Sequence, residues 1–122
     1  MRAMSRHHPV HITLHTASRT LEISFDDGVT YTLPCEYLRV FSPSAKVRGH
    51  GLPEPLLVTG KRSVNITAIE PVGQYAVKLI FDDGHDSGLY DWDFLYALGQ
   101  ERDANWARYL ERLEAAGKTR DA

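Results

Sequence analysis

Residues 81–95 read Phe-Asp-Asp-Gly-His-Asp-Ser-Gly-Leu-Tyr-Asp-Trp-Asp-Phe-Leu, and this stretch decides the fold. An earlier copy, residues 25–38, reads Phe-Asp-Asp-Gly-Val-Thr-Tyr-Thr-Leu-Pro-Cys-Glu-Tyr-Leu. In each copy an apolar run ends in Phe, Asp-Asp-Gly follows, and an aromatic residue and a Leu come later. Asp-Gly between such runs predicts a β-hairpin, because Gly accepts the positive φ that the turn requires. The chain is therefore built on two similar strand–turn–strand–helix units.

Alternating apolar and polar residues predict strands on both sides of each turn, over residues 10–16, 20–25, 29–33, 64–69, 75–81 and 85–90. Helices are predicted over 35–41, 92–98 and about 103–116. Pro34 suits the first turn of one helix, Asp91 is a good N-cap, and Gly99 is expected to end the second helix. The last helix carries a stripe of apolar residues, Trp106, Tyr109, Leu110 and Leu113. We expect an α+β fold: a small, mostly antiparallel sheet with a short middle helix, and C-terminal helices packed on one face.

Size and composition indicate one ordinary globular domain. The chain has 122 residues, 43% of them apolar and 25% charged, with a net charge of −2. This charge gives no general attraction to nucleic acid or anionic lipid, and no apolar run reaches the ~20 residues of a membrane helix. The single cysteine, Cys35, excludes an internal disulfide and suits the cytoplasm. We expect a flexible tail and first strand over 1–18, the main domain over 19–99, and a C-terminal helix and tail over 100–122.

Charge is unevenly distributed along the chain. Residues 39–63 carry five basic side chains against one acidic, whereas residues 81–93 carry five aspartates and neither Lys nor Arg. One interpretation is that the two segments complement each other within the fold. The other is that the basic segment faces a partner.

The sequence contains few signals for a catalytic nucleophile, a phosphate-binding loop or a metal site. Cys35 has no accompanying glycine elbow or local catalytic signature, and no phosphate-binding glycine loop is present. The N-terminal histidines do not predict a shared ion, because an extended chain separates His11 from His15 by about 13 Å. We expect a protein that is not an enzyme.

Two motifs give the chain a family resemblance. Residues 38–51, Leu-Arg-Val-Phe-Ser-Pro-Ser-Ala-Lys-Val-Arg-Gly-His-Gly, combine with Phe-Asp-Asp-Gly-His-Asp-Ser at 81–87 and Trp-Asp-Phe-Leu at 92–95. Together they resemble the gamma-butyrobetaine hydroxylase-like N-terminal domain family, over roughly residues 20–99. In carnitine-pathway dioxygenases such a domain precedes a 2-oxoglutarate/iron catalytic domain, and a similar segment is appended to some bacterial iron–sulfur carrier proteins. The resemblance implies a free-standing version of this accessory domain.

The resemblance also implies which positions of this sequence correspond to the family's zinc ligands, three cysteines and one histidine. The family's three cysteines fall on Ser42, Ser44 and Val47, and its histidine falls on His85. Serine is a poor neutral ligand and valine is none, so a tetrahedral zinc site is not expected. The alternative is a zinc or iron site that uses His85 with a different ligand set, such as His50 and the carboxylate of Asp86.

The resemblance favours a non-catalytic interaction domain without a cofactor. Its expected partner is an iron-dependent oxygenase or an iron–sulfur assembly protein, and neither nucleic acid nor membrane is expected. The chain itself would be a monomer or homodimer. The expected partner-binding residues are Arg39, Ser42, Ser44, Arg48 and His50. His85 has a second interpretation, in which it only fixes the hairpin, and Arg39 could likewise pair internally with the 82–86 acidic cluster.

Overall fold

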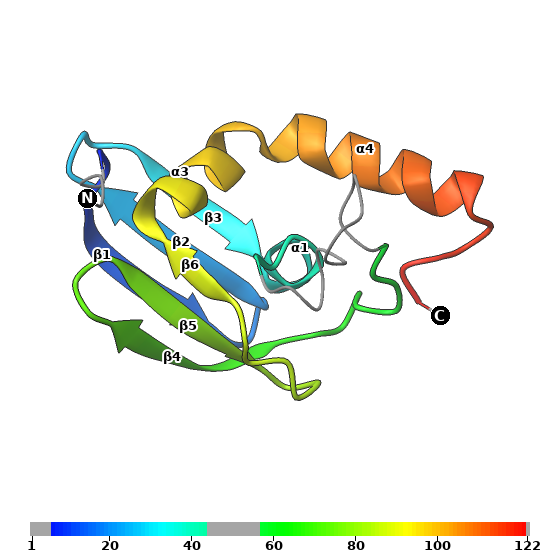
Figure 1. Ribbon diagram of the computed structural model, residues 1–122, viewed down its shortest axis with the longest axis horizontal. Coiled ribbons are helices and arrows are strands. Elements are labelled where there is room, and N and C mark those ends of the chain that lie inside the picture. The colour runs from blue at the N-terminus through cyan, green and yellow to red at the C-terminus, as the bar shows by residue number, and fades with distance from the viewer. Residues whose placement is uncertain (1–5, 44–56, 122) are drawn as a thin grey trace.

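The computed structural model describes residues 6–43 and 57–121, which form an α+β fold (Figure 1). Strands β1 (Pro9–His15), β2 (Thr20–Phe25) and β3 (Thr30–Pro34) form one antiparallel sheet in that order. Strands β4 (Ile66–Val72), β5 (Ala76–Phe81) and β6 (Leu89–Asp91) form the second. The described helices are α1 (Cys35–Val40), α3 (Trp92–Gln100) and α4 (Arg102–Ala115). The predicted class is confirmed, although the strands form two sheets rather than one.

The two Asp-Asp-Gly hairpins have the same internal bonds. Phe25 N donates to Val29 O and Gly28 N donates to Phe25 O, at 2.8 and 3.0 Å. The second hairpin repeats this pattern, with Phe81 N to His85 O at 3.0 Å and Gly84 N to Phe81 O at 3.1 Å. Gly28 and Gly84 have φ of 88° and 90°, a region that side chains other than glycine rarely adopt. The predicted turn chemistry is confirmed in both copies.

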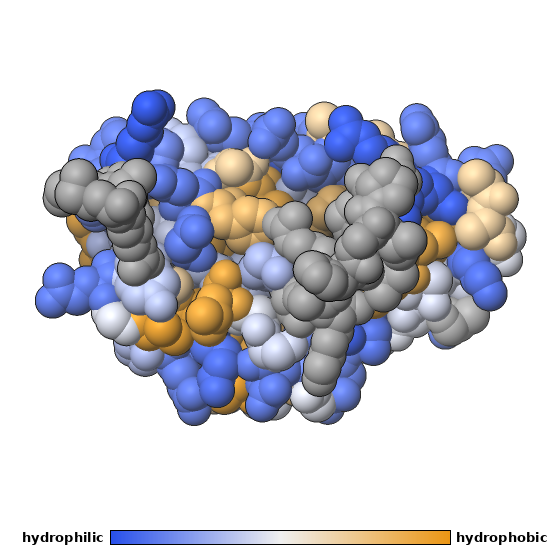
Figure 2. Space-filling view, in the orientation of Figure 1, coloured by the Kyte–Doolittle hydropathy of each residue, from blue (hydrophilic) through white to orange (hydrophobic). Residues whose placement is uncertain are grey.

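A single hydrophobic core joins the two sheets. Strand β2 contributes Leu21, Ile23 and Phe25, and strand β5 contributes Val77, Leu79 and Phe81, all buried. This follows from alternation, because every second side chain of a strand faces the same side. Helix α3 completes the core with Leu95 and Leu98. Figure 2 shows apolar side chains gathered beside α3 on one face, with a largely hydrophilic rim.

The two C-terminal helices pack against different elements. Helix α3 contacts β3 and β6, and its N-cap is confirmed because Asp91 accepts a bond from Phe94 N at 2.7 Å. Helix α4 packs on α1 instead of on a sheet, through Tyr109 and Leu113 against Val40. Leu110 is 41% exposed, so the predicted apolar stripe is narrower than the sequence indicated.

The prediction that Gly99 ends α3 is wrong, since the helix continues to Gln100. A Cβ at Gly99 would lie only 2.3 Å from Cδ2 of Tyr31. Tyr31 belongs to β3, so the glycine allows the helix to lie directly on the strand. The residue serves packing between elements and not helix termination.

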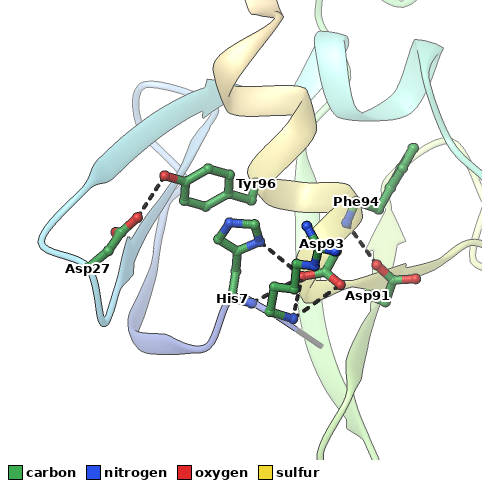
Figure 3. Close-up of polar contacts among 7 residues, drawn as sticks. His7, Asp27, Asp91, Asp93, Phe94 and Tyr96 are labelled. Atoms are coloured by element: carbon green, nitrogen blue, oxygen red, sulfur yellow. Dashed lines mark hydrogen bonds and ion pairs between the residues drawn. The ribbon is translucent and has the colours of Figure 1, made fainter. Parts of the chain in front are cut away.

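Residues Arg6 and His7, within the predicted flexible tail and first strand over 1–18, are held against α3 (Figure 3). Asp93 accepts bonds from the backbone N of Arg6 and His7, and its Oδ1 lies 2.9 Å from His7 Nδ1. The His7 ring stacks on Tyr96 at a centroid distance of 3.6 Å. Residues 1–5 lie outside the described residues. Within 6–43 and 57–121, no helix combines the length and apolar character needed to cross a membrane.

Candidate functional site

The candidate site lies where the C-terminal end of α1 meets the β5–β6 hairpin. Ser42 Oγ lies 2.9 Å from His85 Nε2, and both residues are buried, with exposed fractions of 2% and 9%. Ser42 directly follows the last turn of α1, and His85 directly follows the Asp-Asp-Gly turn. Two residues that the resemblance assigned to one ligand set are therefore in contact. We refer to this contact, together with the Arg39–Asp83 ion pair that links the same two elements, as the joint.

Asp83 provides the charge at the joint. Its Oδ2 accepts from Arg39 Nε at 2.8 Å and from Lys61 Nζ at 2.6 Å, while its Oδ1 accepts from His85 N at 3.1 Å. Burial opposes ionisation of this carboxyl, but the Lys61, His85 and Arg39 contacts outweigh burial and lower the pKa of Asp83 to about 2. The aspartate therefore carries its charge at all physiological pH values.

The basic and acidic segments complement each other within the fold at this point. The side chains of Arg39 and Asp83 are only 12% and 19% exposed, so their ion pair is largely shielded from water. Lys61, which precedes β4, is the second cation that contacts the Asp83 carboxylate. Among residues 6–43 and 57–121, Arg39 Nη1 is buried and has no hydrogen-bond partner, so this nitrogen of the guanidinium is not satisfied there.

The two repeats are tied to each other reciprocally. Asp83 in the second hairpin binds Arg39, the fifth residue of α1. Asp27 in the first hairpin accepts a 2.6 Å bond from Tyr96, the fifth residue of α3 (Figure 3). Each turn therefore uses its second aspartate to hold the helix of the other repeat. Through the same bond, Asp27 raises the pKa of Tyr96 to about 12.

Close packing leaves no room for a larger side chain beside the joint. A Cβ at Gly88 would lie 2.4 Å from Ser42 Oγ and 3.2 Å from Cε1 of Tyr90. Tyr90 is completely buried, and its hydroxyl donates to Leu38 O at 2.6 Å. Burial raises the pKa of this hydroxyl, so it remains protonated.

The remaining predicted site residues lie outside the described residues. These are Ser44, Val47, Arg48 and His50. Of the described candidates, Ser42, His85 and Arg39 come together at the joint, and all three make internal contacts. Asp86 is exposed on the hairpin.

Cys35 is unsuited to nucleophilic catalysis. Burial raises the pKa of its thiol, and its Sγ lies 3.7 Å from Asn65 Oδ1. A thiolate is the reactive form, so a raised pKa reduces reactivity at neutral pH.

Comparison with known proteins identifies the family. The gamma-butyrobetaine hydroxylase-like N-terminal family matches residues 12–96. The chain belongs to this family. Two structures determined by NMR in solution are 52% and 54% identical to it, each with a TM-score of 0.83. The alignments cover 96% and 98% of this chain, and 92% and 90% of the other chains.

A third structure from the comparison is a crystal structure from Acidithiobacillus ferrooxidans ATCC 23270. It is described as a protein of unknown function of the DUF971 family. It is 38% identical, with a TM-score of 0.63, and the alignment covers 75% of this chain and 91% of that chain. No curated protein matches the chain significantly.

The described residues do not fit the zinc ligand set implied by the family resemblance. Ser42 stands where a thiolate is expected, and the Nε2 of His85 is engaged by the Ser42 hydroxyl. Across residues 6–43 and 57–121, no three His, Cys, Asp or Glu side chains are grouped so that they could hold a metal ion. The joint connects α1 to the hairpin by a hydrogen bond and an ion pair.

Sequence reasoning missed the residues that complete the joint. Lys61 and Gly88 carried no individual signal, and Asp83 was one of five aspartates in its segment. The contrast between the basic and acidic segments was the available signal. It indicated which segments attract each other and that Arg39 could pair with the 82–86 acidic cluster, as it does, but not which aspartate would be its partner.

Proposed function

We propose that this member of the family is a non-catalytic interaction domain. Its partner would be an iron-dependent oxygenase or an iron–sulfur assembly protein, as the family resemblance implies. The joint is the observation that supports the proposal. Ser42, at the family's first cysteine position, contacts His85, at its histidine position, and the two form a buried hydrogen bond. Because Ser42 and His85 are both buried, their side chains are not open to a substrate, which supports a role in fixing geometry.

In the proposal, the expected partner-binding residues have two roles: some anchor the segment that follows α1, and the others contact the partner. Arg39 and Ser42 are buried or nearly so, and both bind the hairpin, so they anchor the start of the segment that follows α1. In the proposal, Ser44, Arg48 and His50 of that segment contact the partner. Cations on a docking surface steer association with an acidic partner face and limit the choice of partner.

Reversing the charge at Arg48 should abolish partner binding without unfolding the domain. Immobilised wild type is expected to retain an iron-dependent oxygenase or iron–sulfur assembly protein from lysate, identified by mass spectrometry. Arg48→Glu is expected to retain at least tenfold less, because like charges at an interface repel. The matched control is Arg108→Glu, which makes the same charge change at an exposed position on α4.

Two results would contradict the proposal. Equal retention by wild type and Arg48→Glu would exclude this surface. Retention of a partner with no connection to iron chemistry would exclude the partner class.

A further inference from the structure

A groove lies between α1 and α4, away from the joint. It has a volume of about 450 Å³, and its walls include Glu36, Tyr37, Arg102, Trp106, Leu110 and Arg120. In Figure 1 the C-terminal tail leaves α4 and turns back beneath that helix. Arg120 belongs to this tail, so one wall of the groove is made by a residue that follows α4.

The groove contains a complete recognition site for a guanidinium group. Glu36 is only 6% exposed, and its two carboxylate oxygens accept from Nε and Nη2 of Arg120 at 2.8 and 2.5 Å. This two-bond arrangement matches the planar guanidinium and favours arginine over lysine. The guanidinium carbon also lies 5.2 Å from the centre of the Trp106 ring, a cation–π contact.

Arg62 also contacts the chain on the C-terminal side of that guanidinium. Arg62 N donates to the backbone O of Arg120 at 3.2 Å. The side chain of Arg62 forms an ion pair with Asp121, the next residue of the tail. Glu36 and Trp106 of the groove, together with Arg62, therefore contact an arginine side chain, the carbonyl of that arginine, and the carboxylate that follows it. A small guanidinium compound could make only the first of these contacts.

The helices of the two repeats, α1 and α3, each use their second residue to bind a segment that lies outside the repeats. Glu36 is the second residue of α1 and binds the C-terminal tail. Asp93 is the second residue of α3 and binds the N-terminal segment through Arg6 and His7. Of these two contacts, the one at Glu36 borders a 450 Å³ hollow, which leaves space for additional peptide.

A short segment without regular secondary structure connects Arg120 to α4. Gly117 ends α4 with a φ of 65°, and residues 118–121 form neither helix nor strand. Arg120 remains 28% exposed while it is bound. A short tether keeps the tail at a high local concentration, so it competes with any ligand that uses the same contacts.

We propose that this groove binds an Arg-Asp segment of a partner protein, and that Arg120-Asp121 of the chain itself occupies it in the free state. Among the residues that the structure describes, the groove's lining shares none with the set expected to bind the partner of the proposed function, and its test uses a purified peptide, so either proposal can fail independently.

The probe is the peptide acetyl-Lys-Thr-Arg-Asp-Ala-amide, titrated into the full-length protein labelled with ¹⁵N. Arg120→Ala, whose fold is checked by its amide spectrum, should bind the peptide at least tenfold more tightly than wild type does. A peptide with citrulline in place of arginine should bind at least tenfold more weakly, because it has lost the charge. Adding Glu36→Gln to Arg120→Ala should weaken peptide binding to a similar degree.

A folded Arg120→Ala protein that shows no saturable binding would overturn the proposal, and so would equal affinity for the citrulline peptide. If Arg120→Ala does not fold, the wild type still decides. Excess peptide should then move the Nε–Hε signal of Arg120 to the position of an exposed arginine, and an unmoved signal at saturating peptide would also overturn the proposal.

Discussion

Asp83→Asn should lower the free energy of unfolding by about 1–2 kcal/mol at pH 7, less than the ~2.5 kcal/mol that the full pKa shift corresponds to, because solvent screens this partly exposed carboxylate. Folding lowers the pKa of Asp83 from 3.8 to about 2, and each pKa unit corresponds to about 1.4 kcal/mol. Asparagine keeps the shape of the side chain but removes the charge that Arg39 and Lys61 neutralise. Those two cations would remain close together beside a neutral group.

The effect of Asp83→Asn should depend on pH in a defined direction. A carboxyl whose pKa is lowered by folding stabilises the protein fully above pH 3.8, and this contribution is lost as the pH falls through about 2. The difference between wild type and Asp83→Asn should therefore shrink towards zero near pH 2. Urea unfolding at pH 7, 4 and 2 measures this difference.

Asp86→Asn is the matched control for this experiment. Asp86 is exposed on the same hairpin, so its substitution should change stability by less than about 0.5 kcal/mol at each pH. A loss at Asp83→Asn that stays constant down to pH 2 would show that charge is not what Asp83 contributes.

Gly99→Ala should destabilise the protein, although the same change inside a helix ordinarily stabilises it by up to about 1 kcal/mol. The new Cβ would lie 2.3 Å from Cδ2 and 2.4 Å from Cγ of Tyr31, atoms that cannot move without moving the whole ring. The ring is restrained because it packs edge-on against Phe25 and Tyr96. Overpacking of this kind costs about 1–3 kcal/mol.

A double-mutant cycle with Tyr31→Ala separates the clash from the helix propensity. With Tyr31 shortened, Gly99→Ala should become neutral or stabilising, so the two substitutions should couple by more than about 1 kcal/mol. Urea unfolding of the four proteins gives the coupling. Purely additive effects would contradict the account of Gly99 as a contact between α3 and β3.

Local sequence signals predicted the secondary structure well, because their causes are local. The Asp-Asp-Gly turns need only the φ of Gly28 and Gly84, and the Asp91 cap needs only the next turn of α3. Gly99 was misinterpreted for the opposite reason. Its role depends on Tyr31 in a distant strand, and a glycine near a helix end carries the same local signal whether it ends the helix or packs against a neighbour.

The candidate site was partly predictable. The family motif paired Ser42 with His85 through their positions in a ligand set, and the structure brings these residues into contact. The choice of Asp83 as the partner of Arg39 depends on the hairpin's orientation towards α1, which no sequence spacing specifies. The groove is harder still to predict, because Glu36, Trp106 and Arg120 come from three separate segments.

The central claim is that a hydrogen-bonded joint stands where the family resemblance places a metal site. Native mass spectrometry of the untagged protein, purified without chelator, tests this claim most directly. We predict the mass of the bare polypeptide, as monomer or dimer, for both wild type and His85→Ala. A stoichiometric zinc or iron adduct in wild type that disappears in His85→Ala would contradict the claim and make His85 a metal ligand.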